Sequence, residues 1–379
     1  MKVNFKYATW VAVVLLLGLG SCSNDDGNEN GSESDGTLKT VKVRISRLPS
    51  TYSEGTGTAV GVTPKTNGIG ATLFFIGNGV VKAIETIPAT PGNDIASFSD
   101  DYEIPGTVDK LVIIANSSLA TDPALSTIAV NDSETELNQL KFQQSNQTDP
   151  LTGVNLYGTG SLSSGAFNVT VAPIAARIEI GKVEAKTGAA ISLTSFKLTG
   201  IYINNTYTKL GVDRTTKPTL PAEILNYGTV STSWTDNSYP VNFKNEYSSV
   251  VNGTSFTPSG LNNLWYYFVI PAKANHGTII DGKQQTSVPH IVLKIEDATA
   301  SGYTFAAVSY VTIKQWKTAG DVLLTEFDPG KVYSIASIAI GGENLSDKPE
   351  DGDKITVDVV ISSGSGSSWT DSNTTPSIP

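Results

Sequence analysis

The sequence has little of several residue types that carry common protein chemistry. It contains a single cysteine, Cys22, so no disulfide can form within the chain. Its two histidines, His276 and His290, lie in separate segments, and neither is at metal-ligand spacing from a cysteine or from the other histidine. The glycine-rich phosphate loop and the GxSxG pattern of serine hydrolases are both absent. We therefore expect no metal site, no cofactor and no enzymatic activity.

Positive charge is also scarce. The chain has 26 basic and 36 acidic residues, and its formal net charge is -10. Outside the first residues, the stretch VKVRISR (41–47) is the one basic cluster, which makes nucleic acid and anionic lipid headgroups poor partners. It holds Arg44 and Arg47, two of only four arginines; the others are Arg177 and Arg214.

Residues 1–21 are predicted to be a lipoprotein signal peptide. A positively charged start precedes an apolar run over 8–19, which is shorter than the roughly 20 residues that span a bilayer. The run ends in Leu-Gly-Ser-Cys, which resembles the lipobox of bacterial lipoproteins, where the cysteine sulfur receives diacylglycerol. A buried free thiol is the alternative, but the residues that follow Cys22 are polar. We therefore expect Cys22 to carry a lipid.

Residues 22–36 are acidic, polar and free of aliphatic side chains, which predicts a flexible, solvated tether. Their acidic cluster lacks the full spacing of an EF-hand calcium loop. A serine followed by two aspartates resembles the signal that exports some Gram-negative lipoproteins to the outer face of the outer membrane. The expected location of the precursor is therefore the outer membrane.

The rest of the chain predicts an all-β fold with few short helices. Short strands rich in β-branched residues recur between Gly, Pro, Asn and Asp, which favours packed β-sandwiches. Strands are expected at 69–77, 79–87, 110–115, 165–172, 175–183, 191–204, 264–272, 290–296, 303–313 and 333–341.

The sequence also predicts one short helix and one domain boundary. A capping box formed by Ser133 and Glu136 predicts a short helix within 133–144. The proline that follows Ala172 marks the best domain boundary. We expect an N-terminal sandwich over 37–171 and a C-terminal sandwich over 172–379.

Two similar strands lie near the extremities of the chain. Val41, Val43 and Ile45 alternate with polar residues in the first, as in a strand with one buried face. The second, ITVDVVI, has its β-branched residues at Ile355, Val357, Val359 and Ile361.

These features together resemble the fimbrillin family, the type V pilins of Bacteroidales-type bacteria. The segments that carry the resemblance are VKVRISR, PIAARIEIGKV and the ending DPGKVYSIASIAIGGENLSDKPEDGDKITVDVVI. The resemblance implies two tandem, transthyretin-like β-sandwiches and a structural subunit of a cell-surface fimbria, with a role in adhesion as a further expectation. Its implied partners are other fimbrial subunits, in a homo- or heteropolymer, and the outer membrane through the lipid before processing.

The resemblance also implies how such a subunit assembles. The first strand fills a groove in its own N-terminal sandwich until an arginine-specific surface protease cuts behind it, and a neighbour's C-terminal strand then takes its place. The loop after VKVRISR contains no arginine, unlike the usual family pattern, so we place the cut between Arg47 and Leu48 in preference to Arg44. Residues 355–361 are the predicted donor strand. The tail beyond them is expected to be flexible, or anchored in the neighbour by Trp369.

Two alternatives stay open from the sequence. One is an anchor subunit of the same family that keeps its lipid. The other is a surface glycan-binding lipoprotein, for which Trp265, Tyr266 and Tyr267 are the candidate stacking residues. We favour the other interpretation of that aromatic run, in which alternate members face a β-core and the rest lie on the sheet surface or under a loop.

Overall fold

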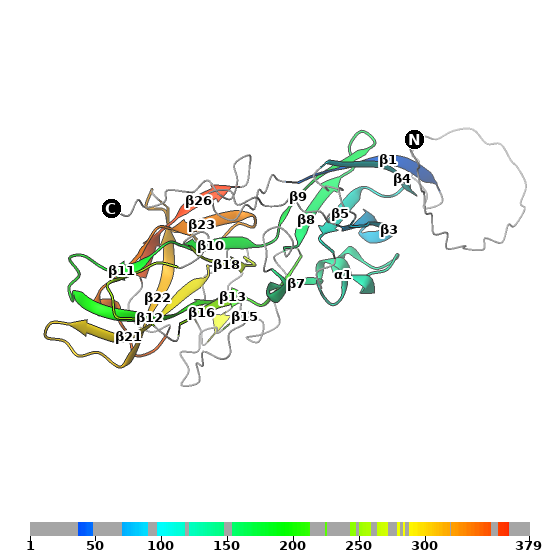
Figure 1. Ribbon diagram of the computed structural model, residues 1–379. Coiled ribbons are helices and arrows are strands. Elements are labelled where there is room, and N and C mark those ends of the chain that lie inside the picture. Colours follow the sequence, from blue (N-terminus) through cyan, green and yellow to red (C-terminus); the bar gives the residue numbers. More distant parts are fainter. Residues whose placement is uncertain are drawn as a thin grey trace, which may run out of the picture.

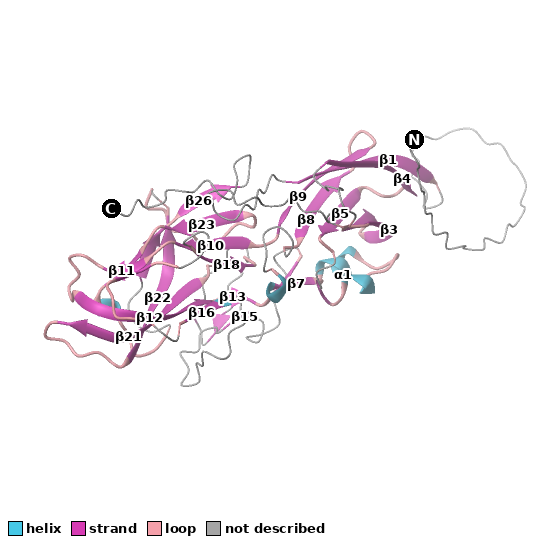
Figure 2. Ribbon diagram, in the orientation of Figure 1, coloured by secondary structure: helices cyan, strands magenta, loops and turns pink. Residues whose placement is uncertain are grey.

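The computed structural model describes residues 37–47, 70–89, 97–117, 121–147, 154–212, 224–225, 243–247, 250–258, 264–271, 279–280, 283–284, 288–318, 320–349 and 355–363. Strands dominate these residues, as Figures 1 and 2 show, and α1 (Glu134–Asn138) is the one α-helix among them. The all-β prediction is confirmed.

The strands of the first part are β1 (Leu38–Arg47), β2 (Ala71–Gly77), β3 (Val80–Ile87), β4 (Ser97–Pro105), β5 (Lys110–Ala115), β6 (Thr121–Asp122), β7 (Lys141–Gln143), β8 (Leu156–Ser161) and β9 (Ala166–Pro173). The next are β10 (Ala176–Ile180), β11 (Val183–Ala185), β12 (Leu193–Asn204), β13 (Thr206–Tyr207), β14 (Lys209–Gly211), β15 (Ile224–Leu225), β16 (Lys244–Glu246), β17 (Ser255–Phe256) and β18 (Trp265–Val269). The last are β19 (Ile279–Ile280), β20 (Lys283–Gln284), β21 (His290–Ala300), β22 (Val308–Lys317), β23 (Lys331–Ile335), β24 (Ile338–Ile340), β25 (Ile355–Asp358) and β26 (Val360–Ser363).

The N-terminal strands form one sheet in the order β3-β2-β5-β8-β9-β1-β4. Each of the seven strands contributes buried apolar side chains to a single core, among them Val43, Phe75, Ile113 and Phe167. Because both ends of the sheet reach the same core, the sheet curves around it.

Helix α1 covers the opposite face of β2 and β5. Ser133 accepts a hydrogen bond from the amide of Glu136, whose side chain accepts one from the Ser133 amide, so the predicted capping box is present. The helix ends earlier than the predicted 133–144 because Lys141–Gln143 pair as β7 with β14. That pairing places Phe142 in the same cluster as Leu137.

The C-terminal strands pack as two facing sheets. A four-stranded sheet, β18-β10-β23-β26, shares one core with a five-stranded sheet, β16-β12-β21-β22-β25. Ile178 and Tyr333 point into this core from the first sheet, and Leu293 and Val311 point into it from the second. This is the arrangement of a β-sandwich.

The predicted domain boundary falls where the chain passes from β9 to β10. One segment crosses it, because β14 pairs with β7 and buries Leu210 beside Phe142. Gln144 also ties the two parts together, since its side-chain oxygen accepts a hydrogen bond of 2.8 Å from the amide of Ile270. The division into domains at 37–171 and 172–379 stays a prediction.

Candidate functional site

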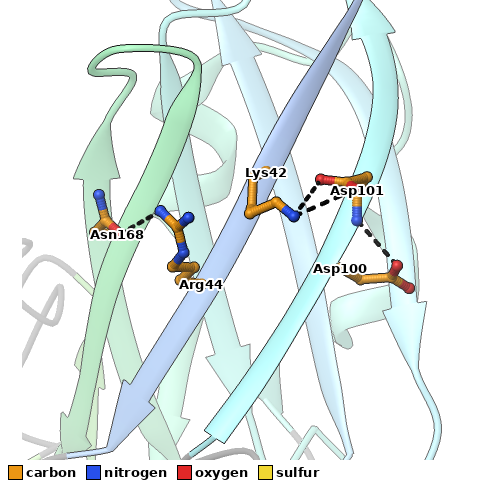
Figure 3. A network of polar contacts seen from close by, with 5 residues as sticks. All are labelled: Lys42, Arg44, Asp100, Asp101 and Asn168. Carbon is orange, nitrogen blue, oxygen red and sulfur yellow. Dashed lines mark hydrogen bonds and ion pairs between the residues drawn. The ribbon is translucent and has the colours of Figure 1, made fainter.

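Strand β1 lies inside the N-terminal sheet, between β9 and β4 (Figures 1 and 3). It pairs in parallel with β9 over Lys42–Arg47 and antiparallel with β4 over Leu38–Ser46. The β8–β9 turn passes through Ser164 and Gly165, both at positive φ, and the Gly165 carbonyl accepts a hydrogen bond of 3.0 Å from the Lys42 amide. The expected strand at 41–47 is therefore an integral part of the sheet.

The inner face of β1 is apolar from Val41 to Ile45. Val41, Val43 and Ile45 are at most 3% exposed and belong to the N-terminal core. Arg44 and Ser46, which alternate with them, are exposed. Because strand side chains alternate between faces, the sequence pattern places three β-branched residues in the core and leaves the polar ones in solvent.

The outer face of β1 makes polar contacts on both sides, which Figure 3 draws for Lys42 and Arg44. The Lys42 ammonium lies 3.2 Å from the carboxylate of Asp101 on β4. On the β9 side, the Arg44 guanidinium donates a hydrogen bond of 3.5 Å to the amide oxygen of Asn168. The hydroxyls of Ser46 and Thr170 are hydrogen-bonded at 2.9 Å.

Strand β4 depends on β1, because β1 is its one ladder partner among the described residues. Its inner face contributes Tyr102, whose ring centroid lies 5.6 Å from that of Phe75. Partial burial, together with the nearby carboxylates of Asp100 and Glu85, raises the pKa of Tyr102 to about 12. Partial burial also raises the pKa of Glu85, on β3 at the other end of the sheet.

The sequence-based strands did not include β4, although it forms one wall of this site. Phe98, Tyr102 and Ile104 do alternate, and that signal was available. It is interrupted by Asp100, which pairs with Val43 yet stays exposed, with its carboxylate accepting a hydrogen bond of 2.9 Å from the Asp101 amide.

The two arginines of β1 differ in their backbone environment. Arg44 is paired on both sides, with Ser99 of β4 and Asn168 of β9. Arg47 is the last residue of the strand and pairs with Val171 of β9, while the described pairing with β4 ends at Ser46. A protease binds its substrate as an extended, unpaired chain, so the doubly paired Arg44 is poorly placed for cleavage.

Arg177 is protected by burial. Its guanidinium lies 2.9 Å from the Glu179 carboxylate and 4.6 Å from the centre of the Tyr266 ring, and the residue is 1% exposed. Glu179 also accepts a hydrogen bond of 2.7 Å from the Ser334 hydroxyl.

The predicted donor segment lies in the C-terminal sandwich. It was expected to be one strand over 355–361, but it forms two short strands in opposite sheets. β25 pairs in parallel with β22, and β26 pairs antiparallel with β23. The chain changes sheets at Val359, whose amide donates a hydrogen bond of 2.8 Å to the Lys317 carbonyl. Strands that switch sheets in this way form the closed edge of a sandwich.

The side chains of this segment alternate only in part. Val357 and Val359 are 5% and 2% exposed and belong to the C-terminal core, whereas Ile361 is 37% exposed. Asp358 points outward, with its carboxylate 3.4 Å from the Lys317 ammonium. The segment is thus packed against its own domain, and its role as a donor stays a prediction.

The aromatic run 265–267 follows the β-core interpretation. Trp265 and Tyr267 are buried in the C-terminal core, and Tyr266 is exposed on the other face of β18, beside Arg177. His290 is buried in β21. Within the described ranges no group of three or more metal-ligating side chains lies close enough to hold an ion.

Several predicted features lie outside the described residues, among them Cys22, Leu48, His276, Arg214 and Trp369. The signal peptide and tether lie outside them as well. None of the helices in the described part of the chain is both long and apolar enough to cross a membrane.

No protein-family model and no curated protein matches the chain. Solved structures do match it. One is a protein of Bacteroides eggerthii described as a "putative cell adhesion protein", with 13% identity and a TM-score of 0.50 over 88% of this chain and 97% of that chain. A protein of Parabacteroides distasonis with the same description has 13% identity and a TM-score of 0.51 over 86% of this chain and 100% of that chain.

A third structure is a fimbrilin of Porphyromonas gingivalis, with 11% identity and a TM-score of 0.50 over 85% of this chain and 96% of that chain. The likeness extends over most of each chain. The chain therefore has the fold of these Bacteroidales proteins, which is consistent with a fimbrillin-family protein, as its sequence predicts.

Proposed function

We propose that the protein is a structural subunit of a cell-surface fimbria that polymerises by protease-triggered strand exchange. The observation that carries this proposal is the position of β1, which is an inner strand of its sheet and ends at an arginine. The fold shared with a fimbrilin and with proteins described as cell adhesion proteins supports a fimbrial or adhesive role and a non-enzymatic protein.

The energetics of β1 suit a removable strand. Its three buried side chains stabilise the core by about 1.5 to 3 kcal/mol each relative to exposure. Its departure would expose these apolar contacts and leave two rows of unpaired backbone groups, on β9 and on β4. That state is costly, so an incoming strand that restores both ladders would bind persistently.

Cleavage between Arg47 and Leu48 would separate β1 from the rest of the chain. The covalent link from β1 runs back through the tether to Cys22, where we place the lipid. The released strand would therefore stay with the outer membrane while the cut subunit enters the filament. An outer-membrane lipoprotein precursor thus becomes a fimbrial subunit.

The incoming strand is proposed to come from the C-terminal segment of a neighbouring subunit, and residues 355–361 are the segment that this chain would donate in turn. In its own domain this segment occupies an edge of each sheet, since β25 and β26 both end a strand order. An edge strand can leave without splitting its sheet, at the expense of the burial of Val357 and Val359. The resulting contact is head-to-tail and does not close on itself, so filaments follow.

Digestion of the precursor by an arginine-specific protease tests this proposal. We expect one cut after Arg47, none after the buried Arg177, and a nicked protein that retains the fragment ending at Arg47 without a covalent bond. Addition of excess free peptide 38–47 carrying a fluorophore should then exchange into the nicked protein and not into the uncut one.

The Arg47→Ala precursor is the matched control, and it should be neither cut here nor open to exchange. Efficient cutting of that variant elsewhere, with normal filament assembly, would remove Arg47 from the mechanism. A precursor whose Arg47 resists the protease in its native setting would instead favour the lipid-retaining anchor subunit.

A further inference from the structure

The groove that β1 occupies has two different rims. On the β4 side, the outward-facing residues opposite Lys42 and Thr40 are Asp101 and Glu103. We call this pair the acidic rim. On the β9 side, the residues opposite Lys42, Arg44 and Ser46 are Ala166, Asn168 and Thr170, none of which is charged. The acidic rim on β4 therefore favours a strand with a positively charged side chain at this position.

Strand β1 places one positively charged side chain, Lys42, against the acidic rim. The Lys42 ammonium lies 3.2 Å from one carboxylate oxygen of Asp101 and 3.4 Å from the other (Figure 3). Arg44, although also a cation, faces Ser99 on β4 and bonds Asn168 on β9. Only the position of Lys42 therefore places a cation directly opposite a carboxylate of the acidic rim.

From these contacts we infer that the groove selects its occupant by charge as well as by apolar pattern. The fitting partner is a strand of a neighbouring subunit that has apolar residues at three alternate positions and a lysine or arginine between the first two, opposite Asp101. This inference rests on the proposed strand exchange and deepens it by naming the chemistry of the strand that binds best.

The chain's own C-terminal segment does not carry that cation. Segment 355–361 can be placed in the groove either in the direction of β1 or in the opposite direction. Each direction has two registers that put apolar residues at the sites of Val41, Val43 and Ile45. In these four arrangements the residue opposite Asp101 is Thr356, Asp358 or Val360. Lys354 reaches that position only if Asp353 occupies a core site.

The self-derived strand is thus a weaker occupant than β1, and in two arrangements it sets Asp358 against Asp101. Like charges directly opposite one another in a sheet are destabilising, whereas opposite charges stabilise the pair. The groove therefore favours a donor strand from a different subunit, one that carries the missing cation, and so a mixed filament over a homopolymer.

The expected size of this preference is modest because both charges are partly exposed. The side chains of Lys42 and Asp101 are 41% and 57% exposed. Replacing the attractive charge pair between Lys42 and Asp101 with a repulsive one should therefore weaken strand binding about threefold to tenfold. The effect should become smaller as salt is added.

Peptide competition on the full chain tests the inference. The non-lipidated chain is nicked after Arg47, if needed at a specific protease site inserted there, and loaded with fluorescent peptide 38–47. Unlabelled 38–47 is compared as competitor with its Lys42→Asp, Lys42→Gln and Arg44→Gln forms. We expect Lys42→Asp to compete about threefold to tenfold less well, Lys42→Gln about twofold less well, and the matched control Arg44→Gln to stay within twofold of the native peptide.

The same competition on the Asp101→Lys protein should reverse this order, with Lys42→Asp now the better competitor. Peptide 354–363 should compete more weakly than its Asp358→Lys form on the native protein, and the reverse should hold on Asp101→Lys. This reversal separates charge recognition from loss of folding, because each peptide is measured on both proteins.

Two results would overturn the inference in different ways. If the native peptide exchanges but all charge variants compete equally on both proteins, strand exchange stands and charge selection is wrong. If no peptide exchanges, the native 38–47 included, the proposed function itself fails and the inference falls with it.

Discussion

Strand β1 and the C-terminal segment 355–361 resemble each other in sequence but occupy different positions in the fold. β1 is one continuous strand of ten residues with a ladder on each side. The C-terminal segment is divided into β25 and β26, of four residues each, and each is an edge strand with one ladder. Both bury β-branched side chains, but the alternation of buried and exposed residues holds through 41–46 in β1 and ends before the exposed Ile361 in the C-terminal segment.

This difference shows that burial and topology set separate costs for removing a strand. Loss of β1 would leave unpaired backbone groups on both β9 and β4. It would also detach β4 from the sheet, because β1 is the ladder partner of β4 among the described residues. Loss of β25 and β26 would shorten two sheets by one edge strand each. β1 therefore suits a strand whose removal needs a protease, and the C-terminal segment suits a strand that leaves its own domain at lower cost.

The largest expected effect comes from a charge in the centre of β1. Val43 is 0% exposed, so Val43→Asp would bury an unpaired carboxylate in the N-terminal core. We expect this change to lower the free energy of unfolding of the precursor by about 3 to 5 kcal/mol. Urea denaturation of the full chain measures it.

Ser46→Asp is the matched control, because Ser46 is an exposed residue of the same strand. It should change the free energy of unfolding by less than about 1 kcal/mol. Equal stability of the Val43→Asp variant and the native precursor would mean that β1 is not packed in the core.

A smaller effect is expected from the same change in the C-terminal segment. Val357 is 5% exposed and lies on an edge strand, so Val357→Asp should cost roughly 2 to 4 kcal/mol of monomer stability and also reduce filament yield. Residues 355–361 were predicted only as a donor strand for a neighbour, and the burial of Val357 and Val359 adds a role in the stability of the monomer.

Thr356→Asp provides the comparison for this variant, since Thr356 is exposed on the same strand. Monomer stability and filament yield should be measured together for Val357→Asp and for a truncation after Asp353. Normal filaments from both variants would exclude this segment as the donor.

The smallest effect is the contribution of Tyr102, on β4, to the pH dependence of the free energy of unfolding. The pKa of Tyr102 is raised to about 12, above its ordinary value of about 10. Between pH 10 and 12 the unfolded chain therefore releases a proton that the folded chain holds, and the free energy of unfolding falls as pH rises. Tyr102→Phe should make that fall shallower.

Burial also raises the pKa of Tyr247 and Tyr267 in the C-terminal part. Because of these two residues, the free energy of unfolding of Tyr102→Phe should still fall with rising pH, but less steeply than that of the native chain. Denaturant titrations at pH 9 and pH 11 on the native chain and on Tyr102→Phe measure the difference. Identical pH slopes would show that the Tyr102 phenol is not packed against the N-terminal core.

Much of the strand pattern could be predicted from the sequence because β-branched residues alternate where one face is buried. The alternation at 41–47 led to β1 and to its three core side chains. Strand β8 gave no such signal, because its glycines replace side chains where β9 comes close. A Cβ atom at Gly158 would lie 2.6 Å from the carbonyl oxygen of Thr170.

The site was only partly predictable, because pairing partners are set by tertiary structure. The sequence indicated that VKVRISR is a strand with one buried face, and the family resemblance implied that it fills a groove, but neither showed that β4 pairs with it and sets Asp101 opposite Lys42. It also could not show that the chain changes sheets at Val359, since both halves of ITVDVVI follow one alternating pattern.

The N-terminal residue and the lipid content of subunits recovered from sheared surface filaments decide whether β1 is removed before assembly. We expect subunits that begin at Leu48, carry no lipid and lack residues 38–47. Filament subunits that begin at Cys22, with the lipid attached and β1 still present, would contradict this expectation.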